Sequence, residues 1–415
     1  MTVATPPKGT GPLARREARL AWGMLMPTII SVSLVVVLPL LSIFWISFKP
    51  IGLADLRPPA PVVREALRGR PEAAGDAAEV EYRIRNSSQD VVLGDVRLEH
   101  EWPEGLVLGG DLDGRCNLDG RLLSCVFGNF EGGQRERLRI PVLVEQAFFD
   151  SGLEIDTNRA SATAEADSIL TNAEFTFENF RRVFDSDEFV EVLWVTMFYT
   201  VVGTVGALLT GLFAAMLLNK SFKGQGILRG LYLFPYVAPV IAVAFTWIIL
   251  FDPFSGSINA LLIQMGVTDE AINFFGQRPL ALIMVTVFEI WRYFPLSFLF
   301  ILARMQSIDT DMYEAADMDG ASPFQKFWYL SLPQLLGILS VLFLLRFIWT
   351  FNKFDDIFLL TGGNAGTRTL TVNVYEQAFA VSNIGAGAAV AVVIFCCLLL
   401  FSFFFFRYMS QEEGL

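Results

Sequence analysis

The 415-residue sequence is 53% hydrophobic and 18% charged, and it contains 38 phenylalanines. This is more apolar material than a soluble chain of this length buries, so the composition excludes an ordinary soluble protein and predicts a polytopic membrane protein. The net charge of -12 comes from residues 51–190, which hold 27 Asp and Glu, 15 Arg and no Lys.

Six stretches are apolar enough to cross a hydrocarbon core about 30 Å thick, which takes about 20 helical residues. They cover residues 21–47, 190–218, 227–251, 280–303, 335–361 and 388–406. Positive residues flank alternate ends of these spans, at Lys8, Arg15, Arg16, Arg19, Lys220, Lys223, Arg229, Arg304, Lys326 and Arg407. The positive-inside rule therefore predicts cytoplasmic termini. The first span is too long for the apolar core of a signal peptide and is expected to stay as an anchor.

Residues 49–188 differ in character, and the same rule places them outside the cytoplasm. The Pro-rich run at 57–61 and the Ala-, Gly- and Glu-rich segment up to about Ala78 predict a linker. From about 79 to 144, short alternating runs separated by Asn-Ser-Ser, Pro-Glu-Gly and Asp-Gly are typical of an antiparallel β-sandwich. Through NSSQDVVLGDV, WPEGLVL and FEGGQRERLRI it resembles the immunoglobulin-like modules of bacterial surface proteins.

Two of the four cysteines lie in this insertion. Cys116 and Cys125 flank NLDGRLLS, whose Asp-Gly pair is a hairpin signal, so we expect a disulfide; two separately buried thiols are the alternative. No metal site is expected, because the only histidine, His100, has no cluster of ligands around it. Cys396 and Cys397 are expected to be packing residues of the last span that face lipid or a neighbouring helix.

The polar connection at 304–334 carries the most specific pattern of the chain. Asp309 or Thr310 is placed to cap a short helix that ends at Gly320. A second helix is predicted to open with a capping box at Ser322 and to be limited by Pro333. An ordinary capped hairpin is the alternative, but it does not account for the small residues beside a charged glutamate.

The segment YEAADMDGASPFQKFWYLSLPQL, residues 313–335, resembles the EAA coupling loop of ABC importer permeases. The order is Glu-Ala-Ala, three residues, Gly, and a closing Leu-Pro. The matching positions, with the aspartate before the glycine, are Glu314, Ala315, Ala316, Asp319, Gly320, Leu332 and Pro333. The resemblance implies that this loop fits a cleft on a separate ATPase subunit.

The resemblance covers about 250 residues from Asn179 onward and narrows to the carbohydrate-uptake branch related to the maltose-type permeases. Its further blocks are residues 226–262, 281–309 and 347–379. The chain departs from the pattern at Val195-Thr196, where many members have Asn-Thr, and in the β insertion. The resemblance implies as partners a second homologous permease, an ATPase dimer and an extracytoplasmic sugar-binding protein, in the cytoplasmic membrane of a bacterium or archaeon.

Motifs for catalysis are missing from the sequence. There is no G-x-x-x-x-G-K-[ST] run for binding ATP, and a single histidine excludes a Ser-His-Asp triad. We therefore expect a non-catalytic subunit without a cofactor of its own, ATP and Mg²⁺ being bound by the partner ATPase. No nucleic acid partner is expected.

Polar residues inside the spans suggest a substrate pathway, since each ionisable group there costs roughly 2.5–3.5 kcal/mol on insertion. Asn352, Asp355 and Asp356 are spaced to share one helical face. The preceding span offers Glu289, Arg292 and Tyr293. Carboxylates, amides and rings suit hydroxyl-rich ligands. The alternative is internal pairing, of Glu289 with Arg292 and of Lys353 with Asp356.

The expected protein is an α-helical polytopic membrane protein with a type I ABC importer permease core and an extracytoplasmic immunoglobulin-like insertion. Its expected function is that of a permease subunit for a di- or oligosaccharide of the α-glucoside type. The expected layout is a cytoplasmic tail at 1–20, a first span at 21–48, the insertion at 49–188, the core at 189–408 and a cytoplasmic tail at 409–415. A secondary sugar transporter and a membrane-anchored adhesion or sensor protein are the alternatives, but there is no internal repeat and the latter would not need five further spans.

Overall fold

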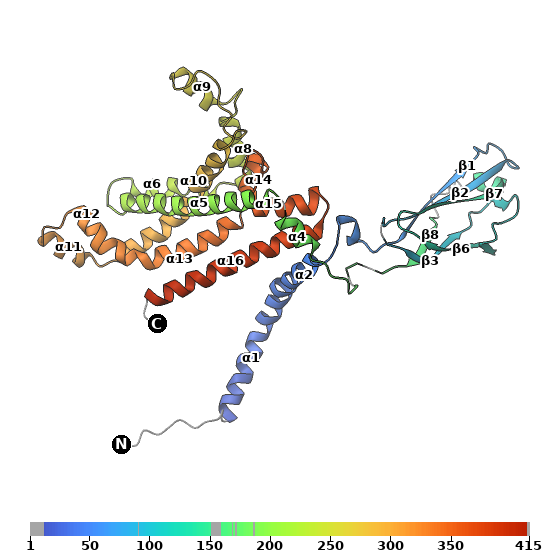
Figure 1. The fold of residues 1–415 in the computed structure, drawn as a ribbon, viewed down its shortest axis with the longest axis horizontal. Helices are drawn as coiled ribbons and strands as arrows, with labels where there is room; N and C mark the ends of the chain where they lie inside the picture. Colours follow the sequence, from blue (N-terminus) through green and yellow to red (C-terminus); the bar gives the residue numbers. More distant parts are fainter. Residues whose placement is uncertain are drawn as a thin grey trace. The chain divides into compact units, whose positions relative to one another are not determined.

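The computed structural model describes residues 12–89, 91–150, 159–167, 169–170, 172–185 and 187–412 (Figure 1). Residues 1–11 and 413–415 of the two predicted tails lie outside this range. The chain divides into two compact units. The helical unit comprises Met1–Phe48, Phe177–Val381 and Gly385–Leu415, and the β unit comprises Lys49–Thr176 with Ser382–Ile384.

The helical unit is built from helices of very different lengths. Their bounds are α1 Pro12–Val32, α2 Leu38–Ser47, α4 Glu178–Phe184, α5 Phe189–Leu218, α6 Gln225–Tyr232, α7 Phe234–Val237, α8 Val240–Leu250, α9 Ser257–Gln264, α10 Leu280–Gln306, α11 Thr310–Met318, α12 Pro323–Lys326, α13 Leu332–Phe351, α14 Asp355–Thr361, α15 Leu370–Tyr375 and α16 Ile384–Glu412. Single π-helical turns at Ser33–Val37, Phe327–Ser331 and Glu376–Ala380 continue α1, α12 and α15.

Within the described residues, five helices are long and apolar enough to cross a membrane, and a bent pair brings the number to six if it counts as one span. This pair, Gln225–Val237 and Val240–Leu250, is bent by 90°. The sequence predicted a span at 227–251, and the structure divides this segment into two helices that pass as a span only when the bent pair is counted as one. Proline disfavours helical backbone in the residue before it, and Ala238, which precedes Pro239, is extended with ψ 143°.

The predicted span at 335–361 is present with different bounds, whereas the predicted stop at Pro333 is wrong. One span runs over Pro323–Phe351, and Pro333 lies inside it, directly after the π-helical turn Phe327–Ser331. The chain leaves the helix at Asn352 and begins again with α14 at Asp355. The two carboxylates in the first turn of α14 suit the positive end of a helix dipole.

Helices α5 and α10 pack closely because α5 presents small residues at intervals of four. Gly203, Ala207, Gly211 and Ala215 are all buried. A Cβ atom added at Gly211 would lie 2.6 Å from Cβ of Ser297 and 2.8 Å from the backbone nitrogen of Phe298 on α10. Small side chains allow such close approach in membrane proteins. The polar residues of α10 are thereby held against α5.

The β unit consists of two four-stranded sheets with antiparallel pairing. The strand orders are β1-β2-β7-β4 and β5-β6-β3-β8. Their bounds are β1 Pro61–Arg68, β2 Ala77–Asn86, β3 Leu93–Glu101, β4 Leu106–Leu108, β5 Cys116–Asp119, β6 Leu122–Phe130, β7 Arg135–Val144 and β8 Ser161–Glu165. A short helix, α3 Gln146–Asp150, follows β7.

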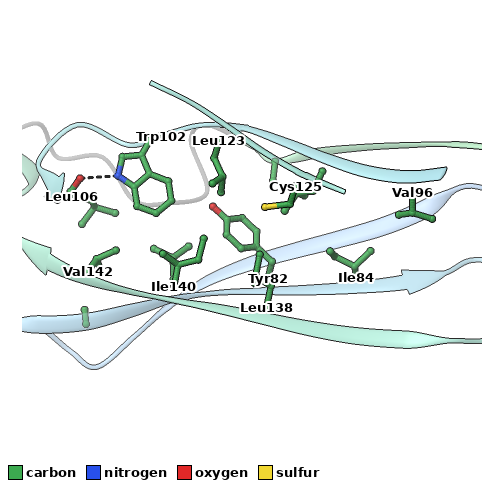
Figure 2. Packing of buried hydrophobic residues seen from close by; sticks show 14 of the residues in the cluster. Tyr82, Ile84, Val96, Trp102, Leu106, Leu123, Cys125, Leu138, Ile140 and Val142 are labelled. Carbon is green, nitrogen blue, oxygen red and sulfur yellow. Dashed lines mark hydrogen bonds between the residues drawn. The ribbon is translucent and has the colours of Figure 1, made fainter. Parts of the chain in front are cut away.

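Alternate residues of both sheets point into one shared core (Figure 2). Its polar atoms are paired: the Trp102 indole donates to the Leu106 carbonyl over 2.7 Å, and the Tyr82 hydroxyl bonds Nδ1 of His100 over 2.6 Å. Burial raises the pKa of the Tyr82 hydroxyl well above its usual value. Strands and turns predicted over 79–144 are present.

The predicted linker up to Ala78 is partly wrong. Residues 61–68 form β1, which pairs with β2 from Pro61 opposite Asn86 to Arg68 opposite Glu79. Proline is tolerated at the first position of an edge strand, and β1 is at the edge of its sheet. The last strand, β8, lies beyond the predicted end of the sandwich and pairs with β3.

Candidate functional site

The connection between α10 and α13 forms two capped helices on the surface. The Asp309 side chain accepts the backbone N–H of Asp311 over 3.1 Å and so caps α11. Ser322 and Gln325 form the predicted capping box at the start of α12. Gly320 between them has φ 77°, a left-handed conformation that suits glycine. Replacing it would strain this turn.

Two contacts hold the halves of this loop together. The hydroxyls of Tyr313 and Ser331 are 2.8 Å apart, and Lys326 pairs with Asp317. Of the predicted coupling residues, Glu314, Ala315, Asp319 and Gly320 are exposed and Ala316 is half-buried. Three large apolar side chains of the same loop are also exposed: Met318 is 89% exposed, Phe324 71% and Tyr329 78%. Large apolar side chains that are exposed within a polar segment are typical of a protein-binding surface.

A charged pair lies inside the helical unit. The Arg346 guanidinium on α13 donates to Oε1 of Glu289 on α10 over 2.7 Å, with side chains 2% and 1% exposed. Thr350 donates to the same oxygen over 2.9 Å, and Tyr199 of α5 donates to Oε2 over 3.1 Å. Three long helices therefore meet at one carboxylate.

Tyr293 joins this pair to a second charged group. Its hydroxyl bonds the ammonium of Lys353, and its ring centroid lies 4.4 Å from that ammonium and 4.8 Å from the Arg346 guanidinium. Lys353 also contacts Asp355 at 3.2 Å and Asp356 at 3.6 Å. Both carboxylate oxygens of the fully buried Asp356 lack a hydrogen-bond partner among the described residues. Asp356 therefore retains hydrogen-bonding capacity inside the unit.

The structure does not support two of the predicted relationships. Asn352 does not share a helical face with Asp355 and Asp356, because the helix ends before it; its exposed side chain donates to the Ile348 carbonyl over 2.9 Å. Arg292 does not pair with Glu289. It donates to the carbonyls of Pro235 and Ala238 over 3.1 and 3.0 Å, which become available where the bent pair of helices breaks.

Sequence reasoning missed three members of the buried cluster, Arg346, Thr350 and Tyr199. Arg346 had a usable signal, because it is an ionisable residue within the apolar run LFLLRFIWTF and needs a partner there. Tyr199 and Thr350 carry no such signal, since hydroxyl residues are common in apolar helices and their partners come from distant segments.

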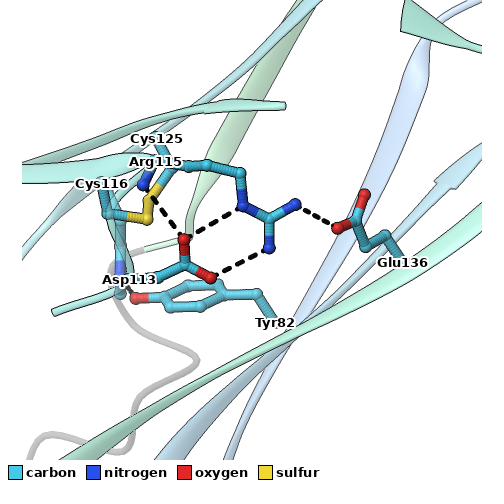
Figure 3. Close-up of a disulfide and its surroundings, with 7 residues drawn as sticks. Tyr82, Asp113, Arg115, Cys116, Cys125 and Glu136 are labelled. Atoms are coloured by element: carbon cyan, nitrogen blue, oxygen red, sulfur yellow. Dashed lines mark hydrogen bonds and ion pairs between the residues drawn. A yellow bond between two sulfur atoms is a disulfide. The ribbon is translucent and has the colours of Figure 1, made fainter. Parts of the chain in front are cut away.

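In the β unit, Cys116 and Cys125 are joined by a disulfide across the neighbouring strands β5 and β6 (Figure 3). Beside it, the Arg115 guanidinium donates to both oxygens of Asp113 over 3.0 and 2.9 Å and also contacts Glu136. The Arg115 side chain thereby lowers the pKa of Asp113 from the usual 3.8 to about 2. These residues fasten the hairpin to the neighbouring sheet.

The helical unit thus keeps a charged cluster inside apolar helices and a capped loop with apolar side chains outside. This is the architecture of a polytopic membrane protein. Residues 207–412 match the family described as "Binding-protein-dependent transport system inner membrane component". The chain is 36% identical over 225 residues to the inner membrane ABC transporter permease protein YcjO of Escherichia coli, covering 53% of this chain and 76% of that protein.

A second relative is the trehalose/maltose transport system permease protein MalF of Thermococcus litoralis, 33% identical over 52% of this chain and 72% of that protein. Among solved structures, a bacterial ABC transporter involved in the import of alginate has a similar fold, with a TM-score of 0.54, 19% identity, and 58% of this chain and 85% of that chain covered. The chain belongs to the binding-protein-dependent ABC transporter permeases, and the predicted resemblance to their carbohydrate-uptake branch is confirmed.

Proposed function

We propose that this chain is a permease subunit of an ATP-driven importer for a di- or oligosaccharide of the α-glucoside type. The trehalose/maltose relative supports the substrate class. With a second homologous permease it would form the pathway, and a partner ATPase dimer would bind ATP and Mg²⁺. A sugar-binding protein would deliver the substrate; one solved structure of similar fold is a complex with an alginate-loaded periplasmic protein. Both termini would be cytoplasmic.

The observation that carries this proposal is the loop Thr310–Ser331. It is stabilised by two caps and an internal hydroxyl pair, yet Met318 is exposed between two apolar helices, and Phe324 and Tyr329 are exposed at the start of the span Pro323–Phe351. Exposing such side chains is unfavourable without a partner. Glu314 and Gly320 stand beside them, and the ATPase would contact this surface.

The pathway would pass the buried cluster of Glu289, Tyr293 and Asp356, with Asp355 at its edge. Asp356 is the best candidate for contact with the sugar, because its carboxylate oxygens have no hydrogen bond in the described structure. A carboxylate accepts several hydroxyl hydrogen bonds, and a tyrosine ring can cover the apolar face of a sugar. The β unit would lie outside the cytoplasm as an immunoglobulin-like module inserted between the first two spans.

The test is Glu314→Lys in the complex assembled with the neighbouring permease, the ATPase and the binding protein. We expect normal abundance of the chain in membranes, and loss of the ATP hydrolysis that the sugar-loaded binding protein stimulates. Glu270→Lys is the matched control, because Glu270 is an exposed glutamate in a different connection. Undiminished stimulation in the Glu314→Lys complex would refute the assignment of the loop.

A further inference from the structure

The outer side of the sheet formed by β1, β2 and β7 is strongly basic, although the unit that contains it is acidic. Residues that point away from the core at alternate positions include seven arginines and two glutamates. They are Arg64, Arg68, Glu79, Glu81, Arg83, Arg85, Arg135, Arg137 and Arg139. We call this surface the arginine face. It holds seven of the 15 arginines in residues 51–190, so the rest of that segment is more acidic than its average.

The strand register places arginines directly opposite one another. Arg83 of β2 is opposite Arg64 of β1 on one side and opposite Arg137 of β7 on the other. In the next row, Arg85 of β2 is opposite Arg135 of β7. Neighbouring strands are about 4.8 Å apart, and like charges directly opposite destabilise a sheet. An anion bound over these rows would remove that repulsion.

One carboxylate orders part of the face and leaves the rest unpaired. Glu81 is completely buried beneath its neighbours and pairs with Arg68, Arg83 and Arg139. Hydrogen bonding from Arg83 lowers the pKa of Glu81. The side chains of the remaining four arginines form no hydrogen bond or ion pair with any described residue; they are Arg64, Arg85, Arg135 and Arg137.

These four and Arg83 line a depression in the sheet surface, together with Val62, Ile84 and Glu136, whose carboxylate is paired with Arg115. A guanidinium group presents a planar fork of donors that matches phosphate and carboxylate oxygens. Five such groups around one depression point to a ligand with several oxyanions. The outward positions of β1, β2 and β7 include no aromatic residue, whereas protein interfaces are usually centred on buried aromatic anchors. The composition therefore favours an extended anionic surface over a protein partner.

Chain connectivity limits how far the first strand of this face can be from a membrane surface. Helix α2 ends at Ser47 and β1 begins at Pro61, so the connecting segment extends to at most about 45 Å. The first span precedes it directly. Electrostatic attraction acts over about 10 Å at 0.1 M salt, while the acidic faces of the same unit are repelled. An anionic membrane would therefore both attract and orient the unit.

We propose that the arginine face binds the phosphate groups of anionic phospholipids in the membrane that the chain spans. Arg64, Arg83 and Arg137 form the central row of contacts, and Arg85 and Arg135 form the next. This binding is separate from sugar transport and does not depend on which substrate the importer carries. It would hold the β unit against the headgroup layer in one orientation.

The experiment uses the full chain in nanodiscs with a fluorophore attached through Ala66→Cys, in a Cys396→Ser/Cys397→Ser background. Ala66 is exposed and lies on β1 between two arginines of the face. Lipids spin-labelled at the headgroup quench the fluorescence when the fluorophore is near the membrane surface. This quenching is compared between nanodiscs of pure phosphatidylcholine and nanodiscs of phosphatidylcholine and phosphatidylglycerol in equal amounts. We expect stronger quenching in the mixture, and its loss when salt rises from about 0.1 M to about 1 M, which shortens the Debye length to about 3 Å.

Arg85→Gln/Arg137→Gln should reduce the phosphatidylglycerol-dependent quenching by at least half, and Arg85→Lys/Arg137→Lys should retain most of it. Arg97→Gln/Arg121→Gln is the matched control, because it removes the same charge from exposed arginines outside the face and should have little effect. Equal quenching in both lipid mixtures, or equal losses in the two glutamine variants, would overturn the proposal. Binding of soluble glycerol phosphate to the arginine face, together with quenching that does not depend on the lipid, would also overturn the proposal, since the site would then bind free phosphates.

Discussion

Glu289 and Arg346 are 57 residues apart in the sequence and form an ion pair of 2.7 Å with almost no exposure to the surroundings. Desolvating two charges costs several kcal/mol, and their attraction compensates only where further hydrogen bonds satisfy the remaining atoms. Thr350 and Tyr199 supply such bonds. The pair therefore ties α5, α10 and α13 together at one depth in the helical unit.

Removing one partner should be costly. Glu289→Ala is expected to lower the free energy of unfolding by about 3–5 kcal/mol, because it leaves the Arg346 charge buried without a partner. Denaturant unfolding in detergent micelles measures this. Glu191→Ala serves as the control, since it breaks an exposed pair with Arg278 and should cost at most about 1 kcal/mol. Equal costs for the two variants would contradict the structural role of the buried pair.

Close packing of α5 on α10 gives a second prediction. Gly211→Ala should destabilise the helical unit by about 1–3 kcal/mol, because the added Cβ meets backbone and side-chain atoms of α10. Gly337→Ala in α13 meets no atom within 4 Å and should stabilise its helix by up to about 1 kcal/mol. Thermal unfolding of the two variants side by side tests the contrast. If Gly211→Ala left the unfolding temperature unchanged, the close contact between α5 and α10 would not contribute to stability.

Asp356 is expected to influence substrate affinity. If its carboxylate accepts sugar hydroxyls, Asp356→Ala should raise the KM for uptake about ten- to a hundredfold, as expected for losing a hydrogen bond to a charged group. Asp355→Ala is the comparison, because Asp355 also contacts Lys353 but is 47% exposed. Uptake of labelled sugar into proteoliposomes gives the values. Should both variants change only thermal stability, internal ion pairing would explain these residues and the pathway would lie elsewhere.

The stability of the β unit should fall in acid. Arg115 lowers the pKa of Asp113 from 3.8 to about 2, so the ionised form stabilises the folded state. This contribution is complete above about pH 4 and is lost as the pH falls towards 2. Asp113→Asn should therefore flatten the stability profile between these values. Protease resistance of the β unit in the full chain measures it, with Asp119→Asn, an exposed aspartate without an ion pair among the described residues, as the control. An unchanged profile in Asp113→Asn would contradict the prediction.

Local sequence signals accounted for several elements well. The capping box at Ser322 and the aspartate cap at Asp309 act within three residues, so their geometry follows from spacing alone. The alternation of apolar residues from 79 to 144 likewise reports which side of each strand is buried. Long apolar runs gave the membrane class, but not the bend at Pro239 or the end of the helix at Asn352. Hydropathy indicates which segments lie in an apolar environment, but it carries no information about helix breaks within such a segment.

The sequence by itself determined the membrane character of the chain, the two caps of the loop and the alternating strands, because each depends on neighbouring residues and on the surrounding solvent. Only the tertiary structure decided that Glu289 pairs with Arg346 rather than with Arg292, and that residues 61–68 form a strand. It also brought the alternating arginines of β1, β2 and β7 into one face. Each of these outcomes joins segments far apart in the chain, and periodicity within one segment carries no information about which partner the fold will place beside it.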